Sequence, residues 1–116
     1  MHERKADVEL SVIVPVGSRH ANARELHDEY KAGLGALGQV YELIYVLDGP
    51  REVFATGLRE LLTDGERFSV IGLTREFGEA TAIMAGFEFA SGETIITLPA
   101  YHQIEGVDVE RLVIAL

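Results

Sequence analysis

Apolar residues along this chain gather into four short, nearly continuous blocks that are rich in β-branched side chains. The blocks run from Leu10 to Val16, from Tyr41 to Leu47, from Phe68 to Leu73 and from Thr94 to Leu98. A strand that is apolar on both faces is typical of a parallel sheet covered by helices on each side. The pattern therefore predicts four buried, parallel strands.

The stretches between these blocks have a different period, because their apolar residues recur three or four positions apart. They contain Leu26, Tyr30, Leu34 and Leu37, then Val53, Phe54, Leu58, Leu61 and Leu62, then Ala80, Ile83, Met84 and Phe87. This spacing indicates amphipathic helices. Alternating strands and helices predict an α/β fold, an open parallel sheet of about four strands with helices on both faces in a three-layer, Rossmann-like arrangement. The third helix is rich in glycine and alanine, so we expect it to lie close to the sheet.

Length and composition fit one domain. The chain has 116 residues, of which 47% are hydrophobic and 25% charged, values that are typical of a globular protein with one core. We therefore treat residues 1–116 as a single domain. A fragmentary helix is expected from about Val107, and the apolar stretch from Arg111 to Leu116 lacks a helix stop signal. This pattern predicts truncation at the C-terminus, and an exposed apolar end predicts a homo-oligomer.

The charge balance narrows the choice of partners and location. Ten Lys and Arg residues against 19 Asp and Glu residues give a net charge of −9, so neither nucleic acid nor an anionic membrane is an expected partner. The absence of cysteine from the sequence excludes disulfides and thiol chemistry. No apolar run approaches the roughly 18 residues of a membrane span. Ala21-Asn22-Ala23 resembles a secretory cleavage site, but three acidic residues precede the first apolar block, which favours a cytoplasmic protein.

One glycine motif matches a dinucleotide-binding fingerprint but lies in the wrong structural context for that function. Gly33, Gly35 and Gly38 match the dinucleotide fingerprint GxGxxG, which binds phosphate only where a strand leads into it and a helix leaves it. Here a predicted helix leads in and a predicted strand leaves. We interpret these glycines as the end of the first helix and the turn into the second strand.

Polar groups follow the predicted strands at the points where each ends. An open parallel sheet binds ligands at the carboxyl ends of its strands, and the sequence places Arg19, Asp48, Arg75 and Tyr101 there. Asp48 could accept hydrogen bonds from a ribose or a base, and the two arginines could bind phosphate.

These polar residues also have structural interpretations. Asp48-Gly49-Pro50 is suitable turn chemistry for capping the second helix. Arg75 could pair with Glu76 or Glu79 at the surface. Spacing alone does not decide between the two interpretations.

Four ordered blocks of the sequence resemble the family 2 glycosyltransferases of the GT-A type. Tyr41–Pro50 is similar to the family's second strand with its terminal Asp-Asp-Gly-Ser, and Leu73–Ala82 is similar to L-S-R-N-F-G-K-E-A-A. Ser11–Val16 resembles the opening strand, and Ala85–Glu93 resembles A-G-L-x-x-A-x-G-D. The resemblance extends from about Glu9 to the end of the chain. Within the family, the chain is most similar to the branch that transfers sugars to polyprenyl phosphates, the dolichyl-phosphate mannose synthase-like branch.

The resemblance implies the N-terminal half of a GT-A fold, which binds a nucleotide-diphosphate sugar. By position, Asp48 matches the second family aspartate and Arg75 matches the loop arginine after the third strand, whereas Leu47 replaces the first aspartate. That replacement weakens recognition of the base or ribose. The candidate nucleotide-sugar-binding residues are Pro15, Val16, Arg19, Asp48, Arg75 and Tyr101.

The end of the fourth strand departs most from the family pattern. The family reads L-D-A-D-x-Q there and uses these aspartates to hold Mg²⁺ or Mn²⁺, whereas this chain reads Leu98-Pro99-Ala100-Tyr101-His102-Gln103. Proline and tyrosine side chains offer no carboxylate to a hard cation. We therefore expect no metal cofactor. His102 with Glu105 is a conceivable replacement pair, but an exposed histidine with a surface role is the favoured interpretation.

Two functions of different classes follow. The chain is either the donor-binding part of a glycosyltransferase or a non-catalytic relative that binds a nucleotide sugar or a protein. The family's general base and acceptor motifs lie beyond position 116, so the catalytic residues are unknown and this chain alone is expected to be inactive. A flavodoxin-like binding module also fits the alternation of strands and helices, but it does not explain the family-like blocks.

Overall fold

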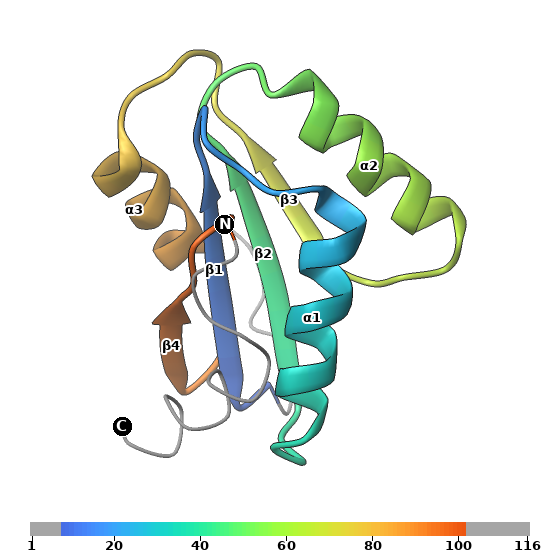
Figure 1. The fold of residues 1–116 in the computed structure, drawn as a ribbon. Helices are drawn as coiled ribbons and strands as arrows, with labels where there is room; N and C mark the ends of the chain where they lie inside the picture. The colour runs from blue at the N-terminus through green and yellow to red at the C-terminus, as the bar shows by residue number, and fades with distance from the viewer. Residues whose placement is uncertain (1–7, 102–116) are drawn as a thin grey trace.

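The computed structural model describes residues 8–101 of the chain. Within them, strands and helices alternate as the sequence predicts (Figure 1). The elements are β1 (Leu10–Val16), α1 (Ala23–Gly35), β2 (Tyr41–Leu47), α2 (Glu52–Thr63), β3 (Ser69–Gly72), α3 (Glu79–Phe89) and β4 (Thr94–Thr97). The predicted α/β class is confirmed, and β3 and β4 are shorter than predicted because Phe68, Leu73 and Leu98 lie outside them.

The four strands form one parallel sheet in the order β3-β2-β1-β4. The chain moves from β1 through β2 to β3 in one direction and then crosses to the other side of β1. Because crossovers between parallel strands are right-handed, this reversal puts α3 on the opposite face from α1 and α2. Figure 1 shows α1 and α2 together on one side of the sheet and α3 alone on the other.

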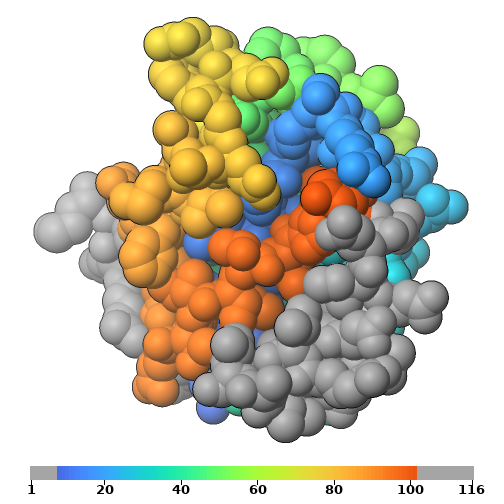
Figure 2. Space-filling view, turned by 60° about the vertical axis from the view of Figure 1, so that its left-hand side comes forward, coloured from blue at the N-terminus to red at the C-terminus, as the bar shows by residue number. Residues whose placement is uncertain are grey.

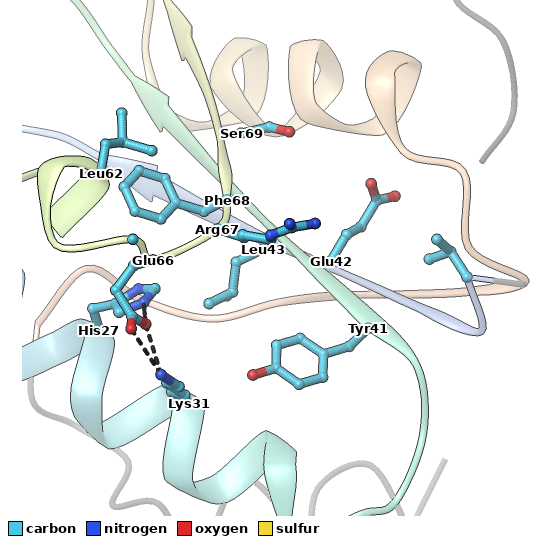
Figure 3. A pocket seen from close by; sticks show the side chains of 12 residues that line it. His27, Lys31, Tyr41, Glu42, Leu43, Leu62, Glu66, Arg67, Phe68 and Ser69 are labelled. Carbon is cyan, nitrogen blue, oxygen red and sulfur yellow. Dashed lines mark hydrogen bonds and ion pairs between the residues drawn. The ribbon is translucent and has the colours of Figure 1, made fainter. Parts of the chain in front are cut away.

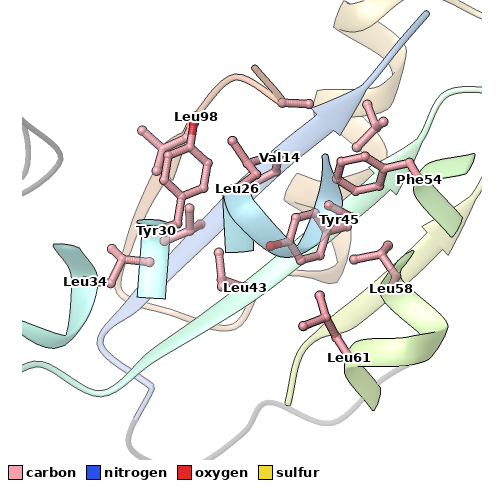
Figure 4. Close-up of a cluster of buried hydrophobic side chains, with 14 of the residues drawn as sticks. Val14, Leu26, Tyr30, Leu34, Leu43, Tyr45, Phe54, Leu58, Leu61 and Leu98 are labelled. Atoms are coloured by element: carbon pink, nitrogen blue, oxygen red, sulfur yellow. The ribbon is translucent and has the colours of Figure 1, made fainter. Parts of the chain in front are cut away.

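The larger core lies between the sheet and the pair α1 and α2 (Figure 4). Alternate residues of β1 and β2 point into it, since side chains of a strand alternate between the two faces. Tyr30, Tyr45 and Phe54 are the largest fully buried side chains there. Burial of this continuous apolar surface is the main source of stability for the fold.

The second core is small and lies under α3. Ile13, Ile44, Val46 and Ala82 are its buried members. A Cβ atom at Gly86 would approach Ile13 Cγ2 to 2.6 Å, so the glycine allows α3 to lie directly on the strand. This confirms the expectation that small residues bring the third helix close to the sheet.

The glycine motif has the structural role predicted from its context. Gly33 and Gly35 belong to the last turn of α1, and Gly38 has a φ of 70° in the turn toward β2. No strand enters the motif, so its amide groups do not form a dinucleotide site.

Several sequence predictions fall outside the described residues. These are the helix expected from Val107, the apolar stretch from Arg111 to Leu116 and the pair His102 and Glu105. Within residues 8–101, no helix has the length and apolar character needed to cross a membrane.

Candidate functional site

A cavity of about 250 Å³ lies at the carboxyl ends of β1 and β2, where the N-terminus of α3 and the end of β4 also meet. It occupies the position where ligands bind in open α/β sheets, beside the strand at which the strand order reverses. Four of the six candidate residues line it: Pro15, Arg19, Asp48 and Tyr101. The structure therefore brings together residues that are up to 86 positions apart in the sequence, from Pro15 to Tyr101.

Arg19 and Tyr101 form one wall of this cavity. The guanidinium carbon of Arg19 lies 4.5 Å from the centroid of the Tyr101 ring, in a cation–π contact. Figure 2 shows the end of the described chain against the segment that follows β1. Such stacking orients the planar guanidinium while leaving its N–H groups available to an anion.

Two hydrogen bonds hold the end of β4 against the rest of the fold. The Ala21 amide donates to the Ala100 carbonyl at 2.8 Å. The buried hydroxyl of Tyr30 donates to the Pro99 carbonyl, and burial raises the pKa of this phenol well above its usual value. The loop before α1 and α1 itself therefore hold the two residues that precede Tyr101, and in this way they set its position.

Asp48 ends β2 and is 4% exposed. Its carboxylate accepts hydrogen bonds from the Phe77 amide at 2.7 Å and from the Gly78 amide at 3.0 Å. These amides precede the first turn of α3, where the helix dipole favours a negative charge. The alternative prediction that Asp48 caps the second helix is wrong, because Arg51 is the N-cap of α2 and α2 has no side-chain cap.

Gly49 also packs the end of β2 against the segment before α3. It has a φ of 90°, and a Cβ atom there would lie 2.8 Å from the Glu76 backbone nitrogen. The chain therefore needs glycine at this position for both its conformation and its close approach. Asp48 and Gly49 together fix the segment from Arg75 to Gly78 to the end of β2.

Arg75 lies in that segment but does not line the cavity. Its guanidinium carbon lies 4.2 Å from the centroid of the Phe77 ring. The predicted pairing with Glu76 or Glu79 is wrong, since Glu76 pairs with Arg51 at 2.9 Å and no ion pair forms between Arg75 and any described residue. Val16 also lies outside the cavity, because it is fully buried in the core under α1 and α2.

Five of the nine residues that line the cavity are absent from the six candidates predicted from sequence: Gly17, Ser18, Glu76, Gly78 and Glu79. Gly17 and Ser18 follow β1, and the other three lie four to seven positions after β3, so their position after a predicted strand was the available signal. The carboxylates of Glu76 and Glu79 add negative charge to the cavity wall, although Arg51 offsets the charge of Glu76. The side-chain charge that remains near the cavity is therefore mixed.

The described part of β4 and the residues after it do not fit a divalent metal. Pro99, Ala100 and Tyr101 offer no carboxylate, and the backbone oxygens of Pro99 and Ala100 already accept hydrogen bonds. Among residues 8–101 there is no cluster of three or more His, Asp or Glu side chains that could hold a metal ion. Hard cations need several such oxygen ligands.

A larger cavity, of about 650 Å³, lies at the opposite edge of the sheet beside the amino ends of β2 and β3 (Figure 3). Glu66 is paired there with Lys31 at 2.8 Å and with the buried His27 at 3.0 Å. The other ring nitrogen of His27 lies 2.8 Å from the Tyr45 hydroxyl. These polar groups bind one another across α1, β2 and the loop after α2, so they stabilise the packing of those elements.

Comparison with known proteins identifies the family of the chain. The sequence profile of glycosyl transferase family 2 matches residues 11–115, and the chain belongs to this family. It is 36% identical over 105 residues to an undecaprenyl-phosphate 4-deoxy-4-formamido-L-arabinose transferase of Edwardsiella ictaluri, covering 90% of this chain and 32% of the relative. A transferase of the same name from Shewanella sediminis is 34% identical, with 97% of this chain and 34% of the relative covered. The predicted resemblance to the polyprenyl-phosphate branch is thus confirmed.

A solved structure shows the same fold. The mannosyltransferase PcManGT from Pyrobaculum calidifontis, in complex with GDP-Man and Mn²⁺, matches with a TM-score of 0.68 and 18% identity. The match covers 79% of this chain and 27% of that one. The predicted GT-A class is therefore confirmed, and the chain spans about a third of the length of the curated relatives that it matches.

Proposed function

We propose that this chain binds a nucleotide-diphosphate sugar in the cavity at the carboxyl ends of β1 and β2, as the donor-binding part of a transferase that glycosylates a polyprenyl phosphate. The observation that carries the proposal is the convergence of Pro15, Arg19, Asp48 and Tyr101 on that cavity. The relatives named for transfer to undecaprenyl phosphate support the acceptor class.

The cavity residues have different roles in the proposed binding of the donor. Arg19 supplies a positive charge for the diphosphate, and Tyr101 holds the guanidinium in place. Asp48 shapes the cavity through the backbone amides before α3. The cavity is smaller than the 300–1,000 Å³ that is usual for ligand sites, so it accommodates only part of a nucleotide sugar.

The site departs from its family in the way that it offsets phosphate charge. In the family, the aspartates at the end of the fourth strand hold a divalent metal. Pro99 and Tyr101 stand there in this chain, so we propose that donor binding relies on Arg19 and does not require Mg²⁺ or Mn²⁺. No catalytic step is assigned to the residues of this chain.

A second candidate function is a non-catalytic member of the family that binds a nucleotide sugar or a protein. Leu47 in place of an aspartate, and Pro99 and Tyr101 in place of two more, favour this alternative. Both functions share the donor cavity, and they differ in whether the full-length protein transfers sugar.

A thermal-shift panel tests the donor proposal. UDP-, GDP- and TDP-sugars are compared with and without Mn²⁺, since a ligand that binds only the folded state raises the melting temperature. We expect one nucleotide class to stabilise the chain, with the same shift in EDTA. Stabilisation by none of the three classes would contradict the proposal, and stabilisation only with Mn²⁺ would contradict its metal-free form.

A further inference from the structure

Arg51 is a second cation beside the donor cavity. It is the N-cap of α2, at the edge of the sheet where the loops after β2 and β3 meet (Figure 1). Its guanidinium donates a hydrogen bond from Nη2 to Glu76 Oε1 at 2.9 Å, and Glu76 lines the donor cavity. One carboxylate therefore separates this positive charge from the proposed diphosphate site.

The surroundings of Arg51 leave its positive charge poorly compensated. Its side chain is only 14% exposed, and the Nε atom is buried with no hydrogen-bond partner among the described residues. The N-terminus of α2 adds positive charge from the helix dipole and has no side-chain cap. Glu52 in the first turn offsets part of that charge but forms no ion pair with Arg51. A largely buried cation in this setting is stabilised by an anion that lies against it.

Glu76 binds Arg51 only weakly. Its side chain is 67% exposed, and it accepts one hydrogen bond from the guanidinium. Ion pairs with an exposed partner add little to stability, because water solvates the free carboxylate nearly as well. Releasing Glu76 from Arg51 therefore costs little free energy. A phosphate group, whose oxygens match the planar guanidinium fork, is a stronger partner.

The charge of the cavity wall shows why a diphosphate needs a further cation there. Arg19 is the only basic residue among those that line the cavity. The other charged lining residues are acidic: Asp48, Glu76 and Glu79. A diphosphate carries a negative charge on each phosphate group, so one guanidinium does not balance it in a site that binds no metal. Arg51 lies within one hydrogen bond of this wall and can supply the missing charge.

We propose that Arg51 is a second diphosphate-binding residue, and that Glu76 occupies its guanidinium while the donor cavity is empty. On binding, a phosphate group takes the place of the Glu76 carboxylate, which turns out into solvent. The inference rests on the proposed function and adds to it this exchange of partners. Glu76 thus competes with the donor for Arg51 and lowers the affinity of the cavity for a diphosphate.

A double-mutant cycle on Arg51 and Glu76 tests the exchange, with inorganic pyrophosphate as the probe and calorimetric titration in EDTA as the measurement. We expect Glu76→Gln to bind pyrophosphate about fivefold more tightly than the parent, because no carboxylate competes for the guanidinium. Arg51→Gln should bind it at least about tenfold more weakly, which is the scale of one charge-assisted hydrogen bond. In the Arg51→Gln background, the gain from Glu76→Gln should be smaller, since only its charge is removed.

Two further variants separate the exchange from the general effect of charge. Glu79→Gln removes the same charge from the same cavity wall, but Glu79 forms no ion pair with any described residue. It should therefore strengthen binding less than Glu76→Gln does, and by the same factor with and without Arg51. Glu76 and Glu79 are both exposed, so their comparison does not depend on whether Arg51→Gln folds. Arg67→Ala, an exposed arginine at the opposite edge of the sheet, should leave the affinity unchanged.

The outcomes distinguish this proposal from the donor proposal. Equal gains from Glu76→Gln and Glu79→Gln would overturn the exchange, and so would absence of pyrophosphate binding by both the parent and Glu76→Gln. Either result leaves the donor proposal to the thermal shifts with nucleotide sugars. Coupling between Arg51 and Glu76 in pyrophosphate binding, without a thermal shift from any nucleotide sugar, would support the exchange and contradict the donor proposal.

Discussion

The carboxylate of Asp48 accepts a hydrogen bond from the Phe77 backbone amide at 2.7 Å. This contact joins the end of β2, at the donor cavity, to the segment that leads into α3. An acidic residue at the end of a parallel strand therefore serves here to fix a loop. We propose that Asp48 contributes to nucleotide binding indirectly, by holding that loop in position.

Replacing Asp48 should loosen the segment before α3. Asp48→Asn keeps one acceptor oxygen and loses the charge, and we expect it to lower the free energy of unfolding by about 1–2 kcal/mol, with Asp48→Ala costing about 2–3 kcal/mol. Urea denaturation measures this loss. Amide hydrogen exchange adds the local information, because protection of Phe77 and Gly78 should fall selectively. Unchanged protection of these two amides would show that the carboxylate does not hold the loop.

Gly49 offers an independent test of the same link. Gly49→Ala places a Cβ atom 2.8 Å from the Glu76 nitrogen at a φ of 90°, so both strain and overlap should reduce stability, by at least about 2–3 kcal/mol. Gly38→Ala is the matched control, since its φ is 70° and nothing lies within 4 Å of the added atom. The control should cost only about 1 kcal/mol. Similar losses in the two variants would contradict the close packing of Gly49 against the loop.

The ion pairs around Glu66 predict a pH dependence of stability. Hydrogen bonds from Lys31 and then from His27 hold the pKa of Glu66 below its ordinary value of 4.5. A lowered pKa in the folded state means that the stabilisation is complete above the unfolded-state pKa and is lost as the pH falls through the folded-state value. Denaturation at a series of pH values from about 7 to 3 should show a steeper loss for the parent than for Glu66→Gln. Glu93→Gln, at the far edge of the sheet, should follow the parent, and parallel profiles for all three chains would count against this role of Glu66.

The end of β4 predicts how metal dependence could be restored. Pro99→Asp together with Tyr101→Asp puts two carboxylates where the family has them, so nucleotide binding by the double variant should become stronger with Mn²⁺. The corresponding double asparagine variant controls for loss of the Arg19 stacking. Calorimetry with and without Mn²⁺ makes the comparison. Equal responses to Mn²⁺ in the aspartate and asparagine variants would show that carboxylates at these positions do not create a metal site.

The strands and helices could be predicted from sequence because their buried positions are the positions that carry apolar residues. Val12, Val14 and Val16 face the larger core while Ile13 faces the smaller one, so β1 is apolar at consecutive positions, as expected of a strand covered on both sides. The convergence of Arg19 and Tyr101 on one cavity also follows from parallel strand ends meeting at one edge of the sheet.

The roles of Asp48 and Arg75 could not be predicted in the same way. The partner of Asp48 is a pair of backbone amides 29 and 30 positions further along the chain, and backbone amides leave no mark in a sequence. Arg75 has two acidic neighbours within four positions, yet its contact is with Phe77. Whether side chains point into or away from the cavity depends on how Asp48 and Gly49 hold this segment, which is a tertiary contact.

Arg19 is the cation that we propose binds the donor diphosphate without a metal. Calorimetric titration in EDTA, with the nucleotide sugar that gives the largest thermal shift, measures this directly for the parent, Arg19→Ala and Arg67→Ala. We predict that the parent and Arg67→Ala bind with equal affinity and that Arg19→Ala binds at least about tenfold more weakly. Absence of binding by the parent in EDTA, or equal affinity of Arg19→Ala and the parent, would contradict metal-free donor binding through Arg19.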